Sequence, residues 1–437
     1  MSTSKQELSL FAAIIINLNI IIGSGVFINT AELAKRAGIF GALCYAVVGV
    51  LLFPLILSFV RLLQLYPGGG FYSFCEQSLS PFVGFLSTWC YFTTKLSSAT
   101  LTIHIFVTLM QKIFPVLSAY DPFILDIGIL CIVVAFNMLN IRTGSTIQGW
   151  LMLFKLFPLF FVIFSGLFFL QGSNLSSVHQ IWSGIPAAIP LVLHALLGFE
   201  TACSISRNIK NPHINAPRAV LISYSIVIIL YVLYQGIFYG ILGTDLAAQP
   251  DYRYTFPLLI NKLAISEYWK ITCANLIYIF IAMSALSAGF GMVYANMWNL
   301  YSLAELKHTI TPRTITRLNR FNIPFICVLA QGIISLLFMI LIRGEQTTYQ
   351  QLSALGATIT YTVSIIGLAK TLLYRGNSIW IAVLGLINCA LLLCAALYAM
   401  WWSQNIKPLA ILSGLMIVGL AMYTQSKRHN EKVGILQ

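Results

Sequence analysis

Residues 20–27, which read Ile20-Ile21-Ile22-Gly23-Ser24-Gly25-Val26-Phe27, lie in the middle of an apolar stretch long enough to cross a bilayer. Glycine costs a helix about 1 kcal/mol relative to alanine, so two glycines around a serine predict an interruption at this point. Small residues also let helices approach closely in membranes. A close helix–helix contact is therefore the alternative interpretation of the same triplet.

A second interruption is predicted in the stretch Leu196-Leu197-Gly198-Phe199-Glu200-Thr201-Ala202, where a glycine and a carboxylate fall within an apolar segment. Interruptions at corresponding positions indicate a transporter built from two inverted repeats. The half-helix that begins after Gly23 would offer free N–H groups and a positive dipole end to a carboxylate. Carbonyl groups released by the break would accept hydrogen bonds from an ammonium. The two breaks together therefore suit an α-amino acid.

The composition around these segments is that of a polytopic membrane protein. Of 437 residues, 59% are hydrophobic and 8% are charged, whereas about 25% are charged in an ordinary soluble domain. Backbone polar groups must be paired internally in lipid, so apolar stretches of about 20 residues are expected to be helices. None of them has the alternating pattern of an outer-membrane barrel. Twelve such stretches are centred near residues 18, 52, 97, 132, 159, 195, 230, 285, 332, 362, 390 and 416.

The net charge of +13 is distributed as in a membrane protein rather than as in a nucleic-acid-binding protein. If the N-terminus is cytoplasmic, lysine and arginine are more frequent in the inner segments than in the outer ones, which is the usual bias. Lys35 and Arg36 are exceptions. An even number of spans then places both termini inside. We therefore expect a multi-pass protein of the cytoplasmic (inner) membrane, with its first span retained rather than cleaved.

Three motifs in this order carry a resemblance to a known family. They are residues 22–27, then Pro67-Gly68-Gly69-Gly70-Phe71-Tyr72, then Gly198-Phe199-Glu200 followed by Lys210-Asn211-Pro212 and Ala216-Pro217-Arg218. Over nearly its whole length the chain resembles the amino acid–polyamine–organocation (APC) superfamily, and within it the bacterial basic amino acid and polyamine antiporters of the arginine–agmatine type. The resemblance implies an all-α integral membrane protein with twelve transmembrane helices. It also implies a LeuT-type 5+5 inverted repeat in which helices 1 and 6 are broken.

The resemblance further implies one transporter domain over residues 1–437. The inverted repeats would cover about residues 8–172 and 183–375, two additional helices about 378–425, and a cytoplasmic tail 426–437. Substrate would be held at the broken middles of helices 1 and 6 and moved by alternating access. Residues 67–72 would form part of the inner gate. Resemblance to the antiporters also suggests a homodimer.

Three ionisable residues lie within predicted spans, where each costs about 2.5–3.5 kcal/mol. Glu200 either caps amides freed at the second break or acts as a gate or proton-linked group, and the resemblance supports the second role. Lys155 either is a charged strut between helix 1 carbonyls and hydroxyls such as those of Ser284 or Ser287, or carries a proton in place of sodium. Both readings disfavour sodium dependence. Lys95 either snorkels or lines the substrate pocket, and its position near mid-span favours the pocket.

Two positions bear on the choice of substrate. In arginine–agmatine antiporters, tryptophans that stack on the guanidinium occupy the positions that align here with His194 and Met292, and a helix 3 asparagine aligns with Ala99. Without an aromatic cage, and with Lys95 nearby, the pocket disfavours a dication. A neutral or acidic amino acid is expected, and a basic amino acid or polyamine is the alternative. The predicted substrate-binding set is Ile21, Gly23, Ser24, Gly25, Lys95, His194, Leu197 and Met292, with Lys155 and Glu200 in coupling or gating.

The expected function is therefore sodium-independent secondary transport of amino acids, either by antiport, which the resemblance favours, or by proton-coupled symport. A membrane-embedded enzyme would use His104, His194 and Glu200 as acid–base groups, but no nucleophile or metal constellation accompanies them. His104 is instead expected to be a packing residue. A channel would favour a repeated ring or filter. The nine cysteines show no C-x-x-C or zinc spacing, so neither a disulfide framework nor a metal site is expected. For a transporter we expect no cofactor and no catalytic residue.

Overall fold

The computed structural model describes most of the chain. In that part, helices are the only regular structure apart from a single β-bridge between Leu8 and Ile209. The described residues are 8–66, 70–139, 145–176, 184–200 and 209–432. Up to residue 200 the helices are α1 (Leu10–Ile21), α2 (Gly25–Ile28), α3 (Thr30–Ala37), α4 (Phe40–Leu65), α5 (Phe71–Glu76), α6 (Pro81–Ile113), the 3-10 helix η1 (Pro115–Ala119), α7 (Pro122–Asn137), α8 (Ser145–Phe169), α9 (Gly172–Ser176) and α10 (Ile185–Leu196). Beyond residue 208 they are α12 (Pro212–Leu242), α13 (Thr244–Ala247), the 3-10 helix η4 (Tyr252–Tyr254), α14 (Thr255–Ile260), α15 (Glu267–Glu305), α16 (Pro312–Ile315), α17 (Phe325–Ile342), α18 (Gln346–Tyr374), α19 (Trp380–Trp402) and α20 (Lys407–Lys432).

Local sequence signals fix where several helices begin. Ser80 Oγ accepts a hydrogen bond from the N–H of Val83 (3.3 Å) at the start of α6. Asp121 Oδ1 accepts one from the N–H of Phe123 (2.8 Å) at the start of α7. Such polar caps satisfy amides that have no partner within the helix. α6, α7 and α12 also begin with proline, whose missing N–H costs nothing in the first turn.

All twelve predicted apolar stretches have their centres on helices. By length and hydropathy alone, eight helical segments of the described chain are candidate membrane spans. α7, α8 and α10 contain shorter apolar helices. α6 is not among the eight candidate spans; it has 33 residues and carries many buried serines and threonines together with Lys95. The helices are thus where the sequence predicts them, and the count of twelve spans stays a prediction. α20 continues to Lys432, so the predicted tail (426–437) begins as helix.

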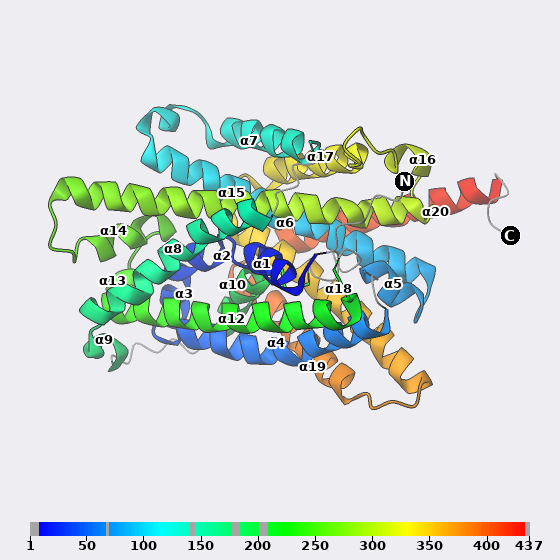
Figure 1. The fold of residues 1–437 in the computed structure, drawn as a ribbon, viewed down its shortest axis with the longest axis horizontal. Helices are drawn as coiled ribbons and strands as arrows, with labels where there is room; N and C mark the ends of the chain where they lie inside the picture. The colour runs from blue at the N-terminus through cyan, green and yellow to red at the C-terminus, as the bar shows by residue number, and fades with distance from the viewer. Residues whose placement is uncertain (1–7, 67–69, 140–144, 177–183, 201–208, 433–437) are drawn as a thin grey trace.

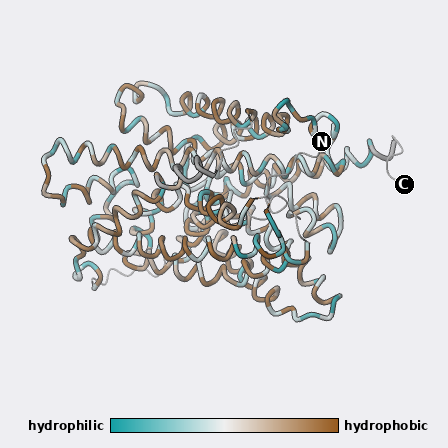
Figure 2. Tube along the Cα trace, viewed as in Figure 1, coloured by the Kyte–Doolittle hydropathy of each residue, from teal (hydrophilic) through white to brown (hydrophobic). Residues whose placement is uncertain are grey.

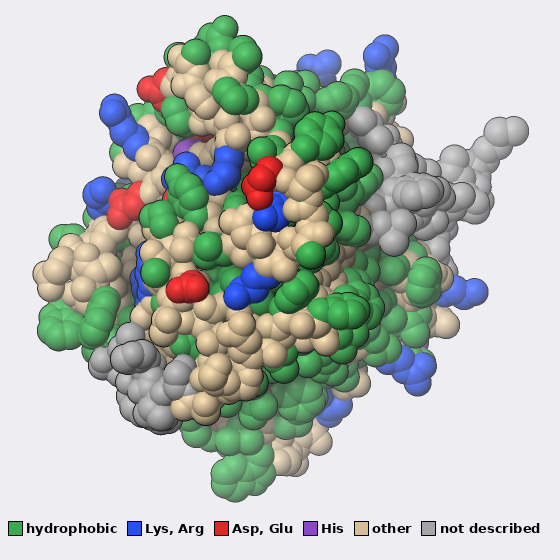
Figure 3. Space-filling model, turned by 90° about the vertical axis from the view of Figure 1, so that its left-hand side faces the viewer, with side chains coloured by type: hydrophobic (Ala, Val, Ile, Leu, Met, Phe, Trp, Pro, Cys, Tyr) green, Lys and Arg blue, Asp and Glu red, His purple; other side chains and the backbone are tan. Residues whose placement is uncertain are grey.

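Most of the long helices run along one axis, which gives the molecule two distinct ends (Figure 1). α5, α16 and the last part of α20 lie at one end, and α9, α13 and α14 lie at the other. Apolar residues predominate along the helices, and hydrophilic residues gather towards the turns (Figure 2). The end with α9, α13 and α14 carries side chains of both charges (Figure 3). This distribution fits a protein whose flanks face lipid and whose ends face water.

The two basic residues that depart from the charge bias have partners in this structure. Lys35 Nζ donates to Pro250 O (3.0 Å). Arg36 forms an ion pair with Glu32 (2.8 Å) and donates to Ala187 O (2.7 Å). These contacts tie α3 to α10 and to the segment after α13. Local packing therefore accounts for the position of both charges.

α6 is the helix on which the site is built. It packs along both α15 and α18, while α4 packs along α12. Nearly all of α6 between Gly84 and Leu109 is buried. The polar side chains of its middle part consequently face other helices rather than lipid.

Candidate functional site

The first predicted interruption is present. α1 ends at Ile21, and α2 begins at Gly25 after a turn at residues 22–24. α3 then follows, with Asn29 between it and α2. The helix is therefore broken at the Gly23-Ser24-Gly25 triplet, with the chain continuing in helical form on both sides.

Side chains from neighbouring helices bind the carbonyl groups at the broken end of α1. Tyr231 Oη of α12 donates to Ile21 O (3.1 Å). Ser284 Oγ of α15 lies within hydrogen-bonding distance of Gly23 O (3.5 Å). Because a buried carbonyl without a donor is costly, such contacts allow the helix to end inside the protein.

Lys155 supplies a third contact of this kind. Its side chain is fully buried, and Nζ donates to Asn19 O (2.5 Å). This is the carbonyl contact expected of a strut. The hydroxyl groups considered as its other partners are used differently: Ser284 turns to Gly23 O, whereas Ser287 Oγ has no partner among the described residues.

The second interruption begins where the sequence predicts it. α10 ends at Leu196, and Gly198 adopts a φ of 124°, a conformation that favours glycine. Its N–H donates to Glu200 Oε2 (2.8 Å). Glu200 thus caps an amide freed by the break, as one of its two interpretations requires. Thr201 and Ala202 of the predicted break lie outside the described residues.

Glu200 also binds two side chains of α6. Its Oε1 accepts hydrogen bonds from Lys95 Nζ (2.8 Å) and Tyr91 Oη (2.7 Å). Lys95 is 6% exposed and Glu200 is 0% exposed. Buried charges are tolerated when they are paired and hydrogen-bonded, so the two groups neutralise each other. Sequence reasoning identified both charges separately and missed both their pairing and the part played by Tyr91.

The two breaks touch each other. A Cβ atom added to Gly25 would lie 2.8 Å from Ala195 Cα, and one added to Gly198 would lie 3.1 Å from Ile21 Cα. Each glycine therefore makes room for the helix that carries the other break. Close approach was the alternative interpretation of the Gly23-Ser24-Gly25 triplet, and here interruption and close approach occur together.

The remaining predicted substrate-binding residues are buried near this contact. Leu197 follows the last residue of α10, and His194 lies in that helix's last turn. Met292 of α15 packs with Ile20 and Ala99 in a small apolar cluster. The breaks are thus bordered by an apolar wall on the α6 and α15 side.

Three buried polar atoms at this place have no hydrogen-bond partner within the described part of the chain. They are Ser24 Oγ, His194 Nδ1 and Ser287 Oγ. Ser24 lies in the first break, and Ser287 precedes Ala288, whose Cβ would be 3.4 Å from a Cβ on Gly23. Buried polar atoms in native proteins almost always have a partner. Each of these atoms is therefore able to form a hydrogen bond with a polar ligand.

Two other predicted features are His104 and the inner-gate segment. His104 Nδ1 is 2.8 Å from Asp126 Oδ2 of α7, so this histidine has a partner of its own. In the predicted inner-gate segment, residues 67–69 lie outside the described part. Tyr72 Oη lies 2.7 Å from His308 Nε2 and connects α5 with the segment after α15.

We expect Gly25→Ala to lower the free energy of unfolding by about 1–3 kcal/mol, because the new methyl group would meet the backbone of Ala195. Gly128→Ala in α7 is the matched control, since nothing lies within 4 Å of the added Cβ. That control should be neutral or stabilising by up to about 1 kcal/mol. Denaturant unfolding in detergent measures both variants, and equal stabilities would contradict the close contact between the breaks.

Known proteins resemble the chain over most of its length. A family model described as amino acid permease matches residues 8–422. The b(0,+)-type amino acid transporter 1 of Mus musculus is 22% identical over 444 residues, which cover 96% of this chain and 88% of the relative. The protein of the same name from Homo sapiens is 22% identical over 446 residues, with the same coverage of 96% and 88%. The aromatic amino acid transport protein AroP of Shigella flexneri is 22% identical over 335 residues, covering 73% of this chain and 70% of the relative.

Proposed function

Because the chain belongs to the amino acid permease family of the APC superfamily, a family of transporters rather than enzymes, we propose that it moves amino acids by alternating access through the contact between its two broken helices. Membership in this family makes it a multi-pass membrane protein with an amino acid as its small-molecule substrate.

The observation that carries the proposal is the set of three unpartnered polar atoms, Ser24 Oγ, His194 Nδ1 and Ser287 Oγ. They come from the first break, from α10, which meets that break at Ala195, and from α15, which meets it at Ala288. A zwitterionic substrate would supply the donors and acceptors that these atoms lack. Each buried polar atom without a hydrogen-bond partner destabilises the protein by about 1–3 kcal/mol. A polar ligand that supplies the missing partners would therefore bind favourably.

The substrate carboxylate would meet the amides of Ser24 and Gly25, where α2 begins and the dipole end is positive. Its ammonium would meet the carbonyl groups of Ile21 and Leu197. Ile21 O already accepts a hydrogen bond from Tyr231 Oη, but a carbonyl oxygen has a second lone pair.

The side chain of the substrate is proposed to be neutral. Lys95 has its charge compensated by Glu200, so an acidic side chain would find no free cation there. The wall formed by Met292 with Ile20 and Ala99 is apolar, and it offers no carboxylate to a basic side chain. A neutral amino acid is therefore favoured over an acidic one, and a basic amino acid or polyamine remains the alternative for the uptake assay.

We propose that transport is sodium-independent exchange of one amino acid for another. The Lys155 ammonium is bound to Asn19 O beside the first break, and like charges repel, so this fixed cation disfavours a sodium ion in the same place. In the described part of the chain no carboxylate forms an ion pair with Lys155, whereas a proton relay needs a nearby acceptor. Proton-coupled symport, with Lys155 as the proton carrier, is the alternative.

The proposed orientation places both termini in the cytoplasm, with the protein in the inner membrane. The charge bias supports this, as does the common end at which α5, α16 and the last part of α20 lie (Figure 1). The broken helices support inverted repeats over about residues 8–172 and 183–375. A homodimer belongs to the same proposal, and the mass of the detergent-solubilised protein tests it.

We expect Ser287→Ala to raise the KM for substrate three- to ten-fold, because one hydrogen bond contributes about 0.5–1.5 kcal/mol. Ser364→Ala in α18 is the matched control. That serine is also buried in a helix, but its hydroxyl donates to Thr360 O (2.9 Å). Initial rates of uptake at increasing substrate concentration measure both variants. An equal KM in Ser287→Ala and the parent protein would show that this hydroxyl does not bind the substrate.

Uptake into proteoliposomes tests the whole proposal. Labelled neutral, acidic and basic amino acids are offered with and without unlabelled amino acid inside, with and without external sodium, and with and without an inward proton gradient. We expect uptake of a neutral amino acid that requires internal substrate and ignores both sodium and the proton gradient. Accumulation driven by the proton gradient alone would show that the protein is a proton symporter and not an exchanger. Absence of uptake of every amino acid and amine would overturn the proposal.

A further inference from the structure

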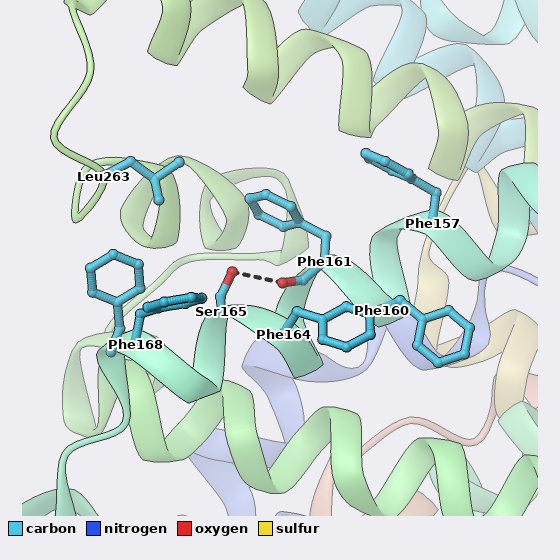
Figure 4. Close-up of a pocket in the computed structure, with 8 residues that line it drawn as sticks. Phe157, Phe160, Phe161, Phe164, Ser165, Phe168 and Leu263 are labelled. Atoms are coloured by element: carbon cyan, nitrogen blue, oxygen red, sulfur yellow. Dashed lines mark hydrogen bonds between the residues drawn. The ribbon is translucent and has the colours of Figure 1, made fainter.

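A groove on the flank of α8 lies outside the site described above. Phenylalanine side chains of α8 line it, and Leu263, from the segment before α15, closes one side (Figure 4). Its volume is about 440 Å³. The polar side chain in its lining, Ser165, donates its hydroxyl to Phe161 O (2.6 Å). The groove therefore presents an apolar surface to whatever occupies it.

The length of the groove matches one leaflet of a membrane. Its lining extends along α8 from Phe157 to Phe169, which is about 18 Å at roughly 1.5 Å per residue. The hydrocarbon core of a bilayer is about 30 Å thick, so one leaflet contributes about half of that. Figure 4 places Leu263 beside the Phe168 end, with Phe157 at the opposite end.

Exposed aromatic residues indicate that the Leu263 end is the one nearer the lipid headgroups. Tyr268 and Trp269 follow shortly after in the chain, and both are largely exposed. Exposed tyrosine and tryptophan residues collect at the membrane–water boundary. This is also the end of the molecule on which α9, α13 and α14 lie and charged side chains appear (Figures 1 and 3). The groove thus begins at the boundary and runs into the hydrocarbon.

A free cation stands at that end. The backbone N–H of Lys262, which precedes Leu263, donates to Leu259 O (3.1 Å). Its ammonium makes no hydrogen bond or ion pair with the residues that the structure describes, whereas that of nearby Lys270 is bound to Glu267 (2.7 Å). A lysine ammonium close to the membrane surface attracts anionic lipid headgroups. The Lys262 ammonium is therefore available to the phosphate of a lipid whose acyl chain enters the groove.

The alternative occupant is a transmembrane helix, and the lining argues against it. Helices associate in membranes through small residues that allow backbones to approach, whereas bulky rings such as those of Phe164 and Phe168 hold a helix away. The volume falls in the range of small-molecule sites, which is about 300–1,000 Å³. We propose that this groove binds one acyl chain of an anionic phospholipid, with Lys262 at the headgroup.

Native mass spectrometry of the full chain in detergent tests the headgroup contact, with phosphatidylglycerol and phosphatidylcholine as the two probes. Lys262→Gln should weaken retention of phosphatidylglycerol about five-fold and leave phosphatidylcholine unchanged. Lys370→Gln changes an exposed lysine near the C-terminal end of α18, and it should leave the retention of both lipids unchanged. Equal loss in the two variants would show only a general charge effect and would overturn the role of Lys262.

A second variant tests the groove itself. Phe164→Ala/Phe168→Ala removes two exposed rings and should weaken retention of both lipids, whereas Phe136→Ala, an exposed ring on α7, should not. Unfolding curves of all variants confirm that they fold, and uptake is not needed for the readout. Unchanged lipid retention in the double variant would overturn the proposal. A loss of dimer in place of a loss of lipid would assign the face to a second copy of the chain.

Discussion

Lys95→Met is expected to abolish uptake and to lower the free energy of unfolding by about 3–5 kcal/mol. The variant leaves the Glu200 carboxylate, which is 0% exposed, without the ammonium that lies 2.8 Å from it. An uncompensated charge in so apolar a place either unfolds the region or takes up a proton. In both cases the hydrogen bond from Gly198 to Glu200 weakens, and with it the geometry of the second break.

The double variant Lys95→Met/Glu200→Gln separates stability from transport. It removes both charges and keeps a side chain that accepts from Tyr91, so most of the lost stability should return. Uptake should stay at background, because the charged pair would still be missing from the site. Lys370→Met is the control for removing a lysine from an exposed position. If Lys95→Met were as stable as this control, the pair would contribute nothing to folding.

Lys155→Ala is expected to reduce exchange to background and to lower the free energy of unfolding by about 2–5 kcal/mol. The change leaves a cavity in a fully buried position and deprives Asn19 O of its donor. Lys155→Gln keeps a hydrogen-bond donor but no charge that a proton could add or remove. If the lysine is a strut, this second variant should recover part of the exchange.

Counterflow and gradient-driven uptake decide between the two roles of Lys155. We expect the parent protein to exchange substrate at the same rate with and without a proton gradient. Accumulation driven by the gradient in the parent protein, and lost in both Lys155 variants, would establish the lysine as the proton carrier. Comparison with Ser364→Ala, whose change lies away from the breaks, controls for a general loss of packing.

The fold class and both breaks could be predicted because their signals are local. Glycine weakens a helix wherever it stands, so the triplet at residues 23–25 and Gly198 marked the breaks without knowledge of any neighbour. The pairing of Lys95 with Glu200 could not be predicted in this way, since 105 positions separate the two residues along the chain. One general rule could have suggested it, because buried charges are nearly always paired.

The capping of the first break shows the same limit. The sequence suggested that Lys155 would meet helix 1 carbonyls, and it does, at Asn19 O. It gave no indication that Tyr231 of α12 would bind Ile21 O. A tyrosine hydroxyl in an apolar helix has no fixed partner until the tertiary packing decides which backbone it faces.

The shared space between Gly25 and Ala195, and between Gly198 and Ile21, has a consequence for any attempt to redesign the protein. At each of these positions the missing side chain leaves space that a residue of the other broken segment fills, so a larger side chain introduced at one position alone meets an occupied neighbour. Libraries that randomise the two partners jointly should yield functional combinations that no stepwise path through single variants can reach. Substitutions in the two broken segments are therefore coupled at that point, although some 170 residues separate the segments in the sequence.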